Sequence, residues 1–238
     1  LTVQEKETID IQVRFRETPG YQIVSELMIL YNTLIAQFCI NNNLPAIFRS
    51  QPAPDLANLP DISQFSNKIA GAQTIRYLAS RRFQSARLET EPNPHGALGI
   101  PAYVQATSPL RRYPDLKIQR QVSHFLTSNL PLYNHDEMKS IAQEAEFRLK
   151  ELTKIEEIRK RYWLLKHLKK TVLEDANEKR FEAVVLENQE KRHALLELID
   201  FPFRIKCDLP QTILQGEIVY LTLVDVNLWQ RRGIFKHC

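Results

Sequence analysis

The chain has 238 residues, of which 43% are hydrophobic and 25% charged, a composition typical of a folded globular protein. Its 32 basic and 28 acidic residues leave a net charge of +4, so any nucleic-acid-binding surface must be local. Its 3 cysteines form no Cys-x-x-Cys pair, so neither a zinc site nor a disulfide framework is indicated, and a cytoplasmic location fits. No uncharged apolar run is long enough to span a membrane, and we expect no membrane contact.

Hydrophobic periodicity predicts an alternation of long helices and short strands over the first 170 residues. Apolar residues at steps of three and four predict helices, and strict alternation predicts strands. The expected elements are a strand at 9–15, helices at 21–40 and within 63–88, a short strand at 46–50, and helices at 114–126 and 135–170.

Residues 171–238 differ in character, since five β-rich segments follow one another at 181–186, 193–200, 203–207, 217–226 and 229–236. Short strands at this spacing predict an OB-fold barrel. Its aromatic residues are candidates for a base-stacking platform, although we expect most of them in the core. They are Phe201, Phe203, Tyr220, Trp229 and Phe235.

The stretch from Tyr103 to Arg120 carries the strongest chemical signal. Ser108 followed by Pro109 is typical of a helix start, and Pro114 predicts that this first turn stops before a second helix begins. Arg111 and Arg112 then lie in a turn with free backbone N–H groups nearby. Guanidinium groups, hydroxyls and a helix N-terminus together suit a phosphate. The alternative is that one arginine only pairs with Asp115.

The run Thr-Ser-Pro-Leu-Arg-Arg-Tyr-Pro-Asp-Leu at 107–116, followed by Arg120, resembles the signature of the ribonuclease II and ribonuclease R (RNB-type) family of exoribonucleases. Gln105 and Gln119 stand where many relatives have His. A second block resembles the family at Ile23–Asn32 and again at Leu44-Pro45 and Phe48-Arg49, as do Glu157 and Trp163 further on.

The resemblance implies roles for individual residues. Arg111 would face the reacting phosphodiester and act in catalysis. Ser108, Arg112, Glu26 and Glu157 would contact RNA. Three alternatives remain open from the residues alone: Arg112 pairs with Asp115, Glu26 is a helix-surface residue, and Glu157 pairs with Arg161 four residues on.

The resemblance also implies an α+β fold. The C-terminal part of an RNB-type catalytic domain would occupy residues 1–170, followed by a small five-stranded OB-fold β-barrel that binds RNA at 171–238. The implied activity is 3′–5′ hydrolytic degradation of single-stranded RNA to nucleoside monophosphates.

The family holds Mg²⁺ with an aspartate cluster, Asp-x-Asp-Asp-Ala, which is absent from this sequence. We therefore expect the metal-binding aspartates upstream, in the other half of the same protein, and expect this chain alone to be inactive. One alternative is a non-catalytic RNA-binding or scaffold protein that retains the fold. Another is a regulatory subunit without RNA affinity.

Overall fold

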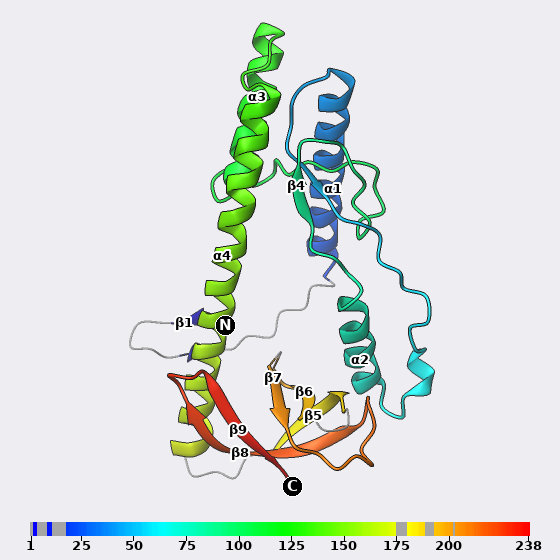
Figure 1. Ribbon diagram of the computed structural model, residues 1–238, viewed down its shortest axis with the longest axis vertical. Helices are drawn as coiled ribbons and strands as arrows, with labels where there is room; N and C mark the ends of the chain where they lie inside the picture. Colours follow the sequence, from blue (N-terminus) through cyan, green and yellow to red (C-terminus); the bar gives the residue numbers. More distant parts are fainter. Residues whose placement is uncertain (1, 4–8, 11–17, 175–179, 189–192, 202) are drawn as a thin grey trace. The chain divides into compact units, whose positions relative to one another are not determined.

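The computed structural model describes residues 2–3, 9–10, 18–174, 180–188, 193–201 and 203–238. Most of the expected strand at 9–15 therefore lies outside the described residues. The helices are α1 (Pro19–Asn41), the 3₁₀ turn η2 (Ile62–Gln64), α2 (Lys68–Ser80), α3 (Tyr113–Ser128), α4 (His135–Leu168) and the π-helical turn η3 (Lys169–Glu174). The strands are β1 (Thr2–Val3), β2 (Ile9–Asp10), β3 (Phe48–Ser50), β4 (Arg87–Glu89), β5 (Arg180–Glu187), β6 (Ala194–Leu198), β7 (Arg204–Cys207), β8 (Ile218–Asn227) and β9 (Arg232–His237) (Figure 1).

The chain divides into two compact units. The barrel unit comprises residues 1–12, Leu56–Arg82 and Lys154–Cys238, and the motif unit comprises Val13–Asp55 and Phe83–Thr153. Helix α4 contributes residues to both. The units differ from the two domains expected from the sequence, so the domain boundary at residue 170 stays a prediction.

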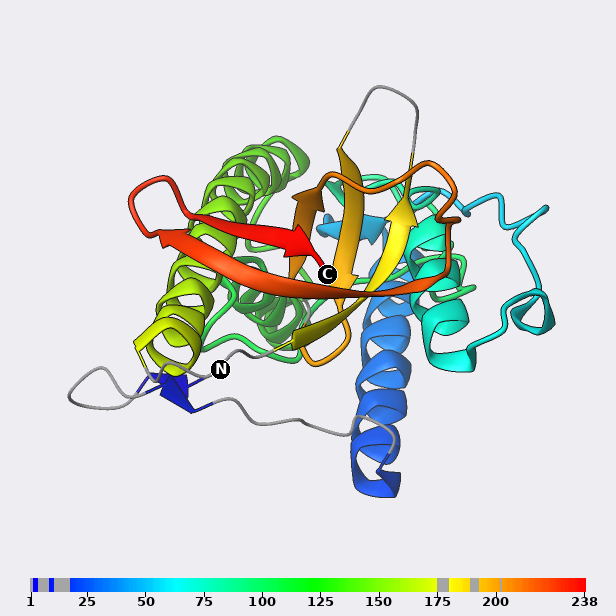
Figure 2. The ribbon, with the colours of Figure 1, turned by 90° about the horizontal axis from the view of Figure 1, so that it is seen from below.

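The barrel unit is built on one antiparallel sheet in the order β7-β6-β5-β8-β9 (Figure 2). Strands β7 and β9 at its two edges also approach each other, so the sheet is nearly closed, as an OB-type barrel requires. Leu164, Leu165 and Leu168 at the end of α4 pack into the barrel core. This confirms the five-stranded barrel predicted from the sequence, with each strand close to its expected position.

Strand β5 is buried on both faces over residues 183–186, which explains the uninterrupted apolar run Ala-Val-Val-Leu there. Ala183 and Val185 face the barrel core. Val184 and Leu186 face outward and pack with Ala70 and Tyr77 of α2. Helix α2 therefore covers the outside of the barrel.

The face of α2 that packs on the barrel is not the one expected from the sequence. The steps of three and four from Phe65 through Ile69 and Ala72 predict a buried stripe, but Ile69 is 59% exposed. The buried residues of α2 are Ala70, Gly71, Thr74 and Tyr77. The difference arises because Ala70 and Tyr77 pack against Val184 and Leu186 of β5, whereas Gly71 lies against Phe65.

Phe65 lies beside two glycines that are far apart in the sequence. A Cβ atom added at Gly71 would lie 2.9 Å from the Phe65 side chain, and one added at Gly216 would also collide with the ring. Gly216 has a φ of +87°, which other residues rarely adopt. The ring thereby joins the start of α2 to the turn before β8.

The motif unit has a core formed by α1, the β3 region, the segment before α3, and α3 and α4 themselves. Its fully buried side chains include Ala36, Val104, Ile118 and Met138. Strand β3 pairs with β4, and the N–H of Arg49 donates to the carbonyl of Tyr103. These contacts attach the segment that leads into α3 to the β3–β4 pair.

Helix α1 has only part of its apolar surface in this core. Asn32, Ala36 and Cys39 are buried, whereas Val24, Leu27 and Leu34 on the expected core face are more than half exposed. By length and composition alone, α1 also qualifies as a membrane span, a test that helices of soluble cores and signal sequences pass as well. The absence of membrane contact stays a prediction.

Candidate functional site

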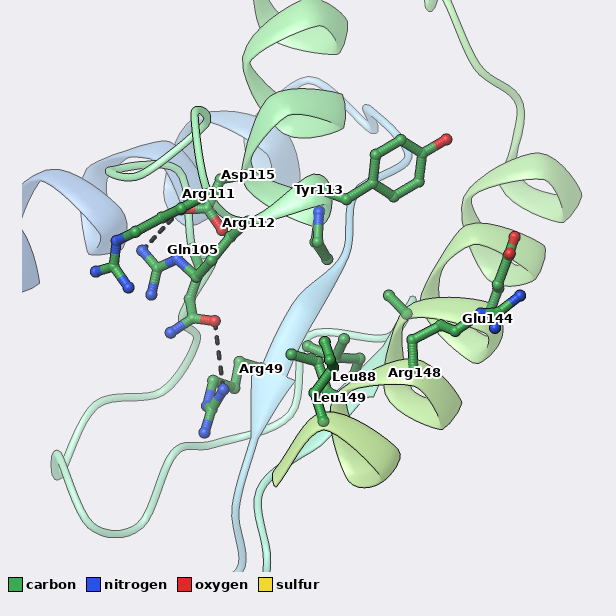
Figure 3. Close-up of a pocket in the computed structure, with 13 residues that line it drawn as sticks. Arg49, Leu88, Gln105, Arg111, Arg112, Tyr113, Asp115, Glu144, Arg148 and Leu149 are labelled. Carbon is green, nitrogen blue, oxygen red and sulfur yellow. Dashed lines mark hydrogen bonds and ion pairs between the residues drawn. The ribbon is translucent and has the colours of Figure 1, made fainter. Parts of the chain in front are cut away.

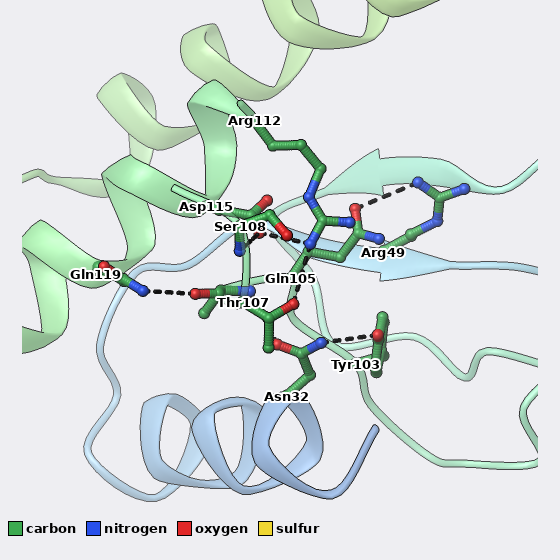
Figure 4. Close-up of polar contacts among 10 residues, drawn as sticks. Asn32, Arg49, Tyr103, Gln105, Thr107, Ser108, Arg112, Asp115 and Gln119 are labelled. Carbon is green, nitrogen blue, oxygen red and sulfur yellow. Dashed lines mark hydrogen bonds and ion pairs between the residues drawn. The ribbon is translucent and has the colours of Figure 1, made fainter. Parts of the chain in front are cut away.

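The segment between Thr107 and Tyr113 forms a tight turn that carries the adjacent residues Arg111 and Arg112; Figure 4 shows Thr107, Ser108 and Arg112 of this segment. The carbonyl of Ser108 accepts hydrogen bonds from the N–H groups of Arg111 and Arg112, at 3.2 and 3.0 Å. Helix α3 then begins at Tyr113, with Pro114 in its first turn. The short turn followed by a helix is therefore confirmed. The Ser108 hydroxyl makes no hydrogen bond within the described residues, so it does not cap this turn as expected.

Arg112 is held by the carboxylate of Asp115. Arg112 Nη2 lies 2.7 Å from Asp115 Oδ2, and the same oxygen accepts the N–H of Ser108 at 2.8 Å. Arg112 also donates to the Thr107 hydroxyl. The Asp115 side chain is 1% exposed and that of Arg112 is 24% exposed. The expected ion pair is thus present, and it fixes both ends of the turn. The expected contact of Arg112 with RNA stays a prediction.

Arg111 has a different environment. Its side chain is exposed and makes no hydrogen bond or ion pair within the part of the chain that the structure describes. It lines a cavity of about 460 Å³ in the motif unit (Figure 3). A guanidinium without a protein partner on a turn fixed by its neighbour is available to an anion without rearrangement.

The cavity combines an apolar wall with four arginines. Its lining residues are Arg49, Leu88, Gln105, Arg111, Arg112, Tyr113, Pro114, Asp115, Glu144, Ala145, Arg148, Leu149 and Leu152. Figure 3 shows Arg49 and Arg112 on one side of the cavity, and Arg148 and Glu144 of α4 on the other. The four arginines outnumber the two carboxylates, Asp115 and Glu144, so the cavity carries an excess of positive charge and suits an anionic ligand with an apolar part.

Burial and the nearby Arg112 lower the pKa of Arg49 from its ordinary value. Its Nη1 donates to Gln105 Oε1 at 3.3 Å. Gln105 thus positions Arg49 in the cavity. Arg148 was not anticipated from the sequence, because a single arginine on a highly charged helix face carries no local signal.

Buried amides hold the segment before the turn. Asn32 Nδ2 donates to the Tyr103 hydroxyl at 2.8 Å, and Asn32 Oδ1 accepts the N–H of Ala106 at 2.9 Å. Gln119 donates to the carbonyl of Ala106 at 2.6 Å. Asn32 is 1% exposed, so α1 contributes a positioning residue that helical periodicity alone did not identify.

The two glutamates implied by the resemblance lie elsewhere. Glu26 is exposed on α1 and is not among the residues that line the cavity. Glu157 is exposed on α4 in the barrel unit. Its expected partner, Arg161, instead donates to the carbonyls of Arg231 and Arg204. Pairing with Arg161 therefore does not account for Glu157, and contacts of either glutamate with RNA stay predictions.

The described residues do not fit a magnesium site. No group of three or more His, Cys, Asp or Glu side chains among them could hold a metal ion. The carboxylate within the motif, Asp115, uses its Oδ2 atom for Arg112 and the Ser108 N–H.

Comparison with known proteins identifies the family. The RNB domain matches residues 1–128. Ribonuclease II, chloroplastic/mitochondrial, from Arabidopsis thaliana is 30% identical over 199 residues, which are 82% of this chain and 24% of the relative. The chain thus spans about a quarter of the length of that relative.

Two solved structures share the fold. RNase R from Mycoplasma genitalium, in complex with ribose-methylated single-stranded RNA, aligns with a TM-score of 0.77 at 16% identity, covering 99% of this chain and 44% of that one. Yeast Ssd1, described as a pseudonuclease, aligns with a TM-score of 0.60 at 18% identity, covering 87% of this chain and 30% of that one. These likenesses show the fold, and the sequence matches show that the chain belongs to the RNB family of ribonuclease II and ribonuclease R.

Proposed function

We propose that the chain is part of a 3′–5′ exoribonuclease that hydrolyses single-stranded RNA to nucleoside monophosphates. The observation that carries the proposal is the contrast between two adjacent arginines. Arg112 is locked to Asp115, whereas Arg111 is exposed, free of protein partners within the described residues, and lines the cavity. The family relationship supplies the reaction class, and the cavity supplies a suitable anion site.

The chemical role of Arg111 follows from the charge that develops during hydrolysis. Attack of water on a phosphodiester increases negative charge on the non-bridging oxygens. A guanidinium held by a tight turn offers two N–H donors to those oxygens and needs little reorganisation. The other arginines of the cavity, Arg49 and Arg148, would hold neighbouring phosphates of the RNA.

The proposal assigns Mg²⁺ binding to carboxylates outside the described residues, in an upstream part of the same protein. The apolar residues exposed on α1, such as Val24 and Leu27, offer a surface on which such a part could pack. A cytoplasmic location remains part of the proposal.

The test compares two polypeptides. The 238-residue chain and a longer product that includes the upstream coding sequence are each incubated with a 5′-labelled oligoribonucleotide and Mg²⁺. We expect the longer protein to release mononucleotides and to shorten the 5′-labelled RNA stepwise from its 3′ end. Addition of a chelator should stop this cleavage. We expect no mononucleotides from the 238-residue chain.

The alternative is a non-catalytic RNA-binding or scaffold protein, a class favoured by the likeness of the fold to the pseudonuclease Ssd1. If the longer protein binds single-stranded RNA and never shortens it, the nuclease proposal is wrong and the alternative is supported. Chelator-sensitive release by the 238-residue chain would instead show that the metal ligands are not upstream.

A further inference from the structure

Leu110 is the most exposed large apolar side chain among the described residues, with a relative exposure of 102%. It lies between Pro109 and Arg111 in the turn of the motif unit. Leu110 is not among the residues that line the cavity, whose apolar wall comes from other leucines. A single exposed leucine is common on protein surfaces, so its significance depends on how it is held.

The turn fixes the Leu110 backbone from both sides. The carbonyl of Ser108 accepts the N–H of Arg111 at 3.2 Å, and the N–H of Ser108 donates to Asp115 Oδ2 at 2.8 Å (Figure 4). Pro109 restricts the backbone further, because its ring fixes φ. The leucine is therefore presented at a defined position, and little backbone freedom remains to be lost when a partner covers it.

Leu110 and Arg111 are neighbours on this turn but have different surroundings. Arg111 lines the positively charged cavity, whereas Leu110 projects into solvent. A surface that covered Leu110 would therefore lie beside the Arg111 guanidinium. Apolar burial there would exclude water, which strengthens the hydrogen bonds of a guanidinium to an anion.

The upstream part of the same protein is the partner that the observations favour. The proposed function assigns the catalytic carboxylates to it, and the arginines of the cavity attract a carboxylate-bearing surface. The matched region is 24% of the Arabidopsis thaliana relative, which has ample further chain to supply such a surface. Val24 and Leu27 of α1, both more than half exposed, are further apolar residues of the motif unit that this part would cover.

We propose that Leu110 is a positioning residue for RNA cleavage. Its side chain inserts into an apolar pocket of the upstream part and thereby sets the distance between the Arg111 guanidinium and the scissile phosphodiester. This deepens the proposed function and rests on it, since the upstream part and the cleaved RNA belong to that proposal. Leu110 itself touches neither the RNA nor the reacting atoms.

Melting temperatures test the contact. Leu110→Ala is introduced into the 238-residue chain and into the longer product that includes the upstream coding sequence. In the longer protein we expect the melting temperature to fall by about 2–4 °C, because an apolar contact is lost. In the 238-residue chain we expect a fall of less than about 1 °C, because an exposed side chain has few contacts to lose. Differential scanning calorimetry measures both.

Single-turnover cleavage at saturating enzyme tests the positioning. Leu110→Ala in the longer protein should lower the rate about 10- to 100-fold through misplacement of Arg111, while RNA affinity stays within about twofold. Leu110→Met should restore most of the rate, because methionine fills a similar volume. Leu130→Ala is the matched control and should change neither quantity, since Leu130 is a 64% exposed leucine in the segment that follows α3.

A double-mutant cycle separates positioning from a merely structural role. If Leu110 acts through Arg111, Leu110→Ala should cause little further loss of rate in an Arg111→Ala background, although the fall in melting temperature persists. If the two losses multiply, Leu110 acts independently of Arg111 and the positioning role is wrong.

Each alternative contact of Leu110 has its own result. Equal falls in the melting temperatures of both polypeptides would show that Leu110 only stabilises its own turn. Weaker RNA binding by the Leu110→Ala variant, with an unchanged melting temperature, would show that the leucine contacts RNA. A lower sedimentation coefficient of the 238-residue Leu110→Ala chain would show that the leucine contacts a second copy. Any of these three results overturns the proposal.

The outcomes also separate this proposal from the proposed function. If the longer protein cleaves RNA and its Leu110→Ala variant melts and cleaves as the wild type does, Leu110 is not a positioning residue and the nuclease proposal is unaffected. If the longer protein never shortens RNA, the nuclease proposal fails and the positioning role fails with it. The melting temperatures then still show whether Leu110 contacts the upstream part.

Discussion

Arg112 and Asp115 form an ion pair across the first turn of α3, with Arg112 Nη2 2.7 Å from Asp115 Oδ2. The carboxylate belongs to a residue with 0% exposure, and it also accepts the N–H of Ser108. The two adjacent arginines thus differ: Arg112 holds the turn together through its ion pair, whereas the Arg111 side chain lines the cavity and is available to a ligand.

Asp115→Asn should destabilise the motif unit. The amide keeps an acceptor for the Ser108 N–H but leaves the partly buried Arg112 guanidinium without its counter-charge. Breaking a buried pair from one side costs roughly 3–5 kcal/mol, and we expect the lower end, about 3 kcal/mol, because Arg112 retains some solvent contact. Urea unfolding followed by far-UV circular dichroism measures the loss. Both tryptophans lie in the barrel unit, so their fluorescence does not report on the motif unit.

Glu156→Gln is the control for Asp115→Asn. Glu156 pairs with Lys160 at 3.8 Å on the exposed surface of α4, and such pairs contribute less than about 1 kcal/mol. Equal, small changes in the free energy of unfolding for both variants would show that the Asp115 pair does not hold the turn.

Arg111→Ala in the longer, active protein should lower the single-turnover cleavage rate by about 10²- to 10³-fold, the typical effect of losing one preorganised donor. Arg111→Lys should not restore the rate, because an ammonium cannot reproduce the two parallel donors. The melting temperature should barely change, because Arg111 is exposed. Rapid-quench cleavage at saturating enzyme gives the rate, and equilibrium binding shows whether affinity is retained.

Arg112→Ala tests which of the two arginines acts in cleavage. We expect it to lower stability as well as activity, since Asp115 then lacks its partner. If Arg112→Ala lost the rate without loss of stability, and Arg111→Ala cleaved normally, the assignment within the pair would be reversed. If both bound RNA poorly but cleaved normally once saturated, the turn would position RNA only.

The positions of helices and strands follow from the sequence, because periodicity depends on burial of one face. The expected and observed bounds of α3, α4 and β5–β9 agree closely. Contacts between distant residues did not follow from periodicity. Arg76 lies in a basic stretch that resembles a solvated or RNA-contacting face, yet its partner is Glu197, 121 residues away.

At the candidate site, too, the sequence did not predict contacts between residues that are far apart in the chain. The motif identified Arg111, Arg112 and Asp115, because these residues are adjacent in the sequence. It did not identify Arg148 of α4 in the same cavity. Nor did periodicity indicate that Asn32 is buried, since a polar residue on a helix is expected to face water until a specific acceptor is known.

His95 should make the motif unit less stable at low pH. Burial, together with the nearby Arg49, lowers the pKa of His95, and its Nδ1 has no partner within the described residues. The folded state therefore resists protonation, while the unfolded chain takes up a proton near pH 6.5. Stability from this residue is present above about pH 6.5 and is lost as the pH falls below it, with a slope that cannot exceed about 1.4 kcal/mol per pH unit for one proton.

His95→Phe should remove this slope, because phenylalanine keeps a ring against Tyr103 and does not titrate. Urea unfolding between pH 5 and 8 measures it, and His237→Gln, at an exposed position, should leave the slope intact. A wild type and a His95→Phe variant with identical pH profiles would contradict the prediction.

The three cysteines should react with iodoacetamide at very different rates. Burial raises the pKa of Cys39 to about 12 and also raises that of Cys207, so little of the reactive thiolate forms at either site. Cys238 is exposed. At pH 8 we expect Cys238 to be modified first, as read by peptide mass spectrometry, and Cys238→Ser to abolish the fast phase. Rapid labelling of native Cys39 would be incompatible with the packing of α1.

The position of the Phe65 ring determines how substitutions at three positions combine. Phe65 occupies the space that a side chain at either Gly71 or Gly216 would need. The three positions cannot vary independently, so in a deep mutational scan they should behave as one epistatic group. A smaller residue at position 65 should suppress a damaging Gly71→Ala change only in part, because Phe65 Cβ itself lies 2.9 Å from the added atom; suppression at Gly216 should also be weak, because its backbone conformation itself favours glycine.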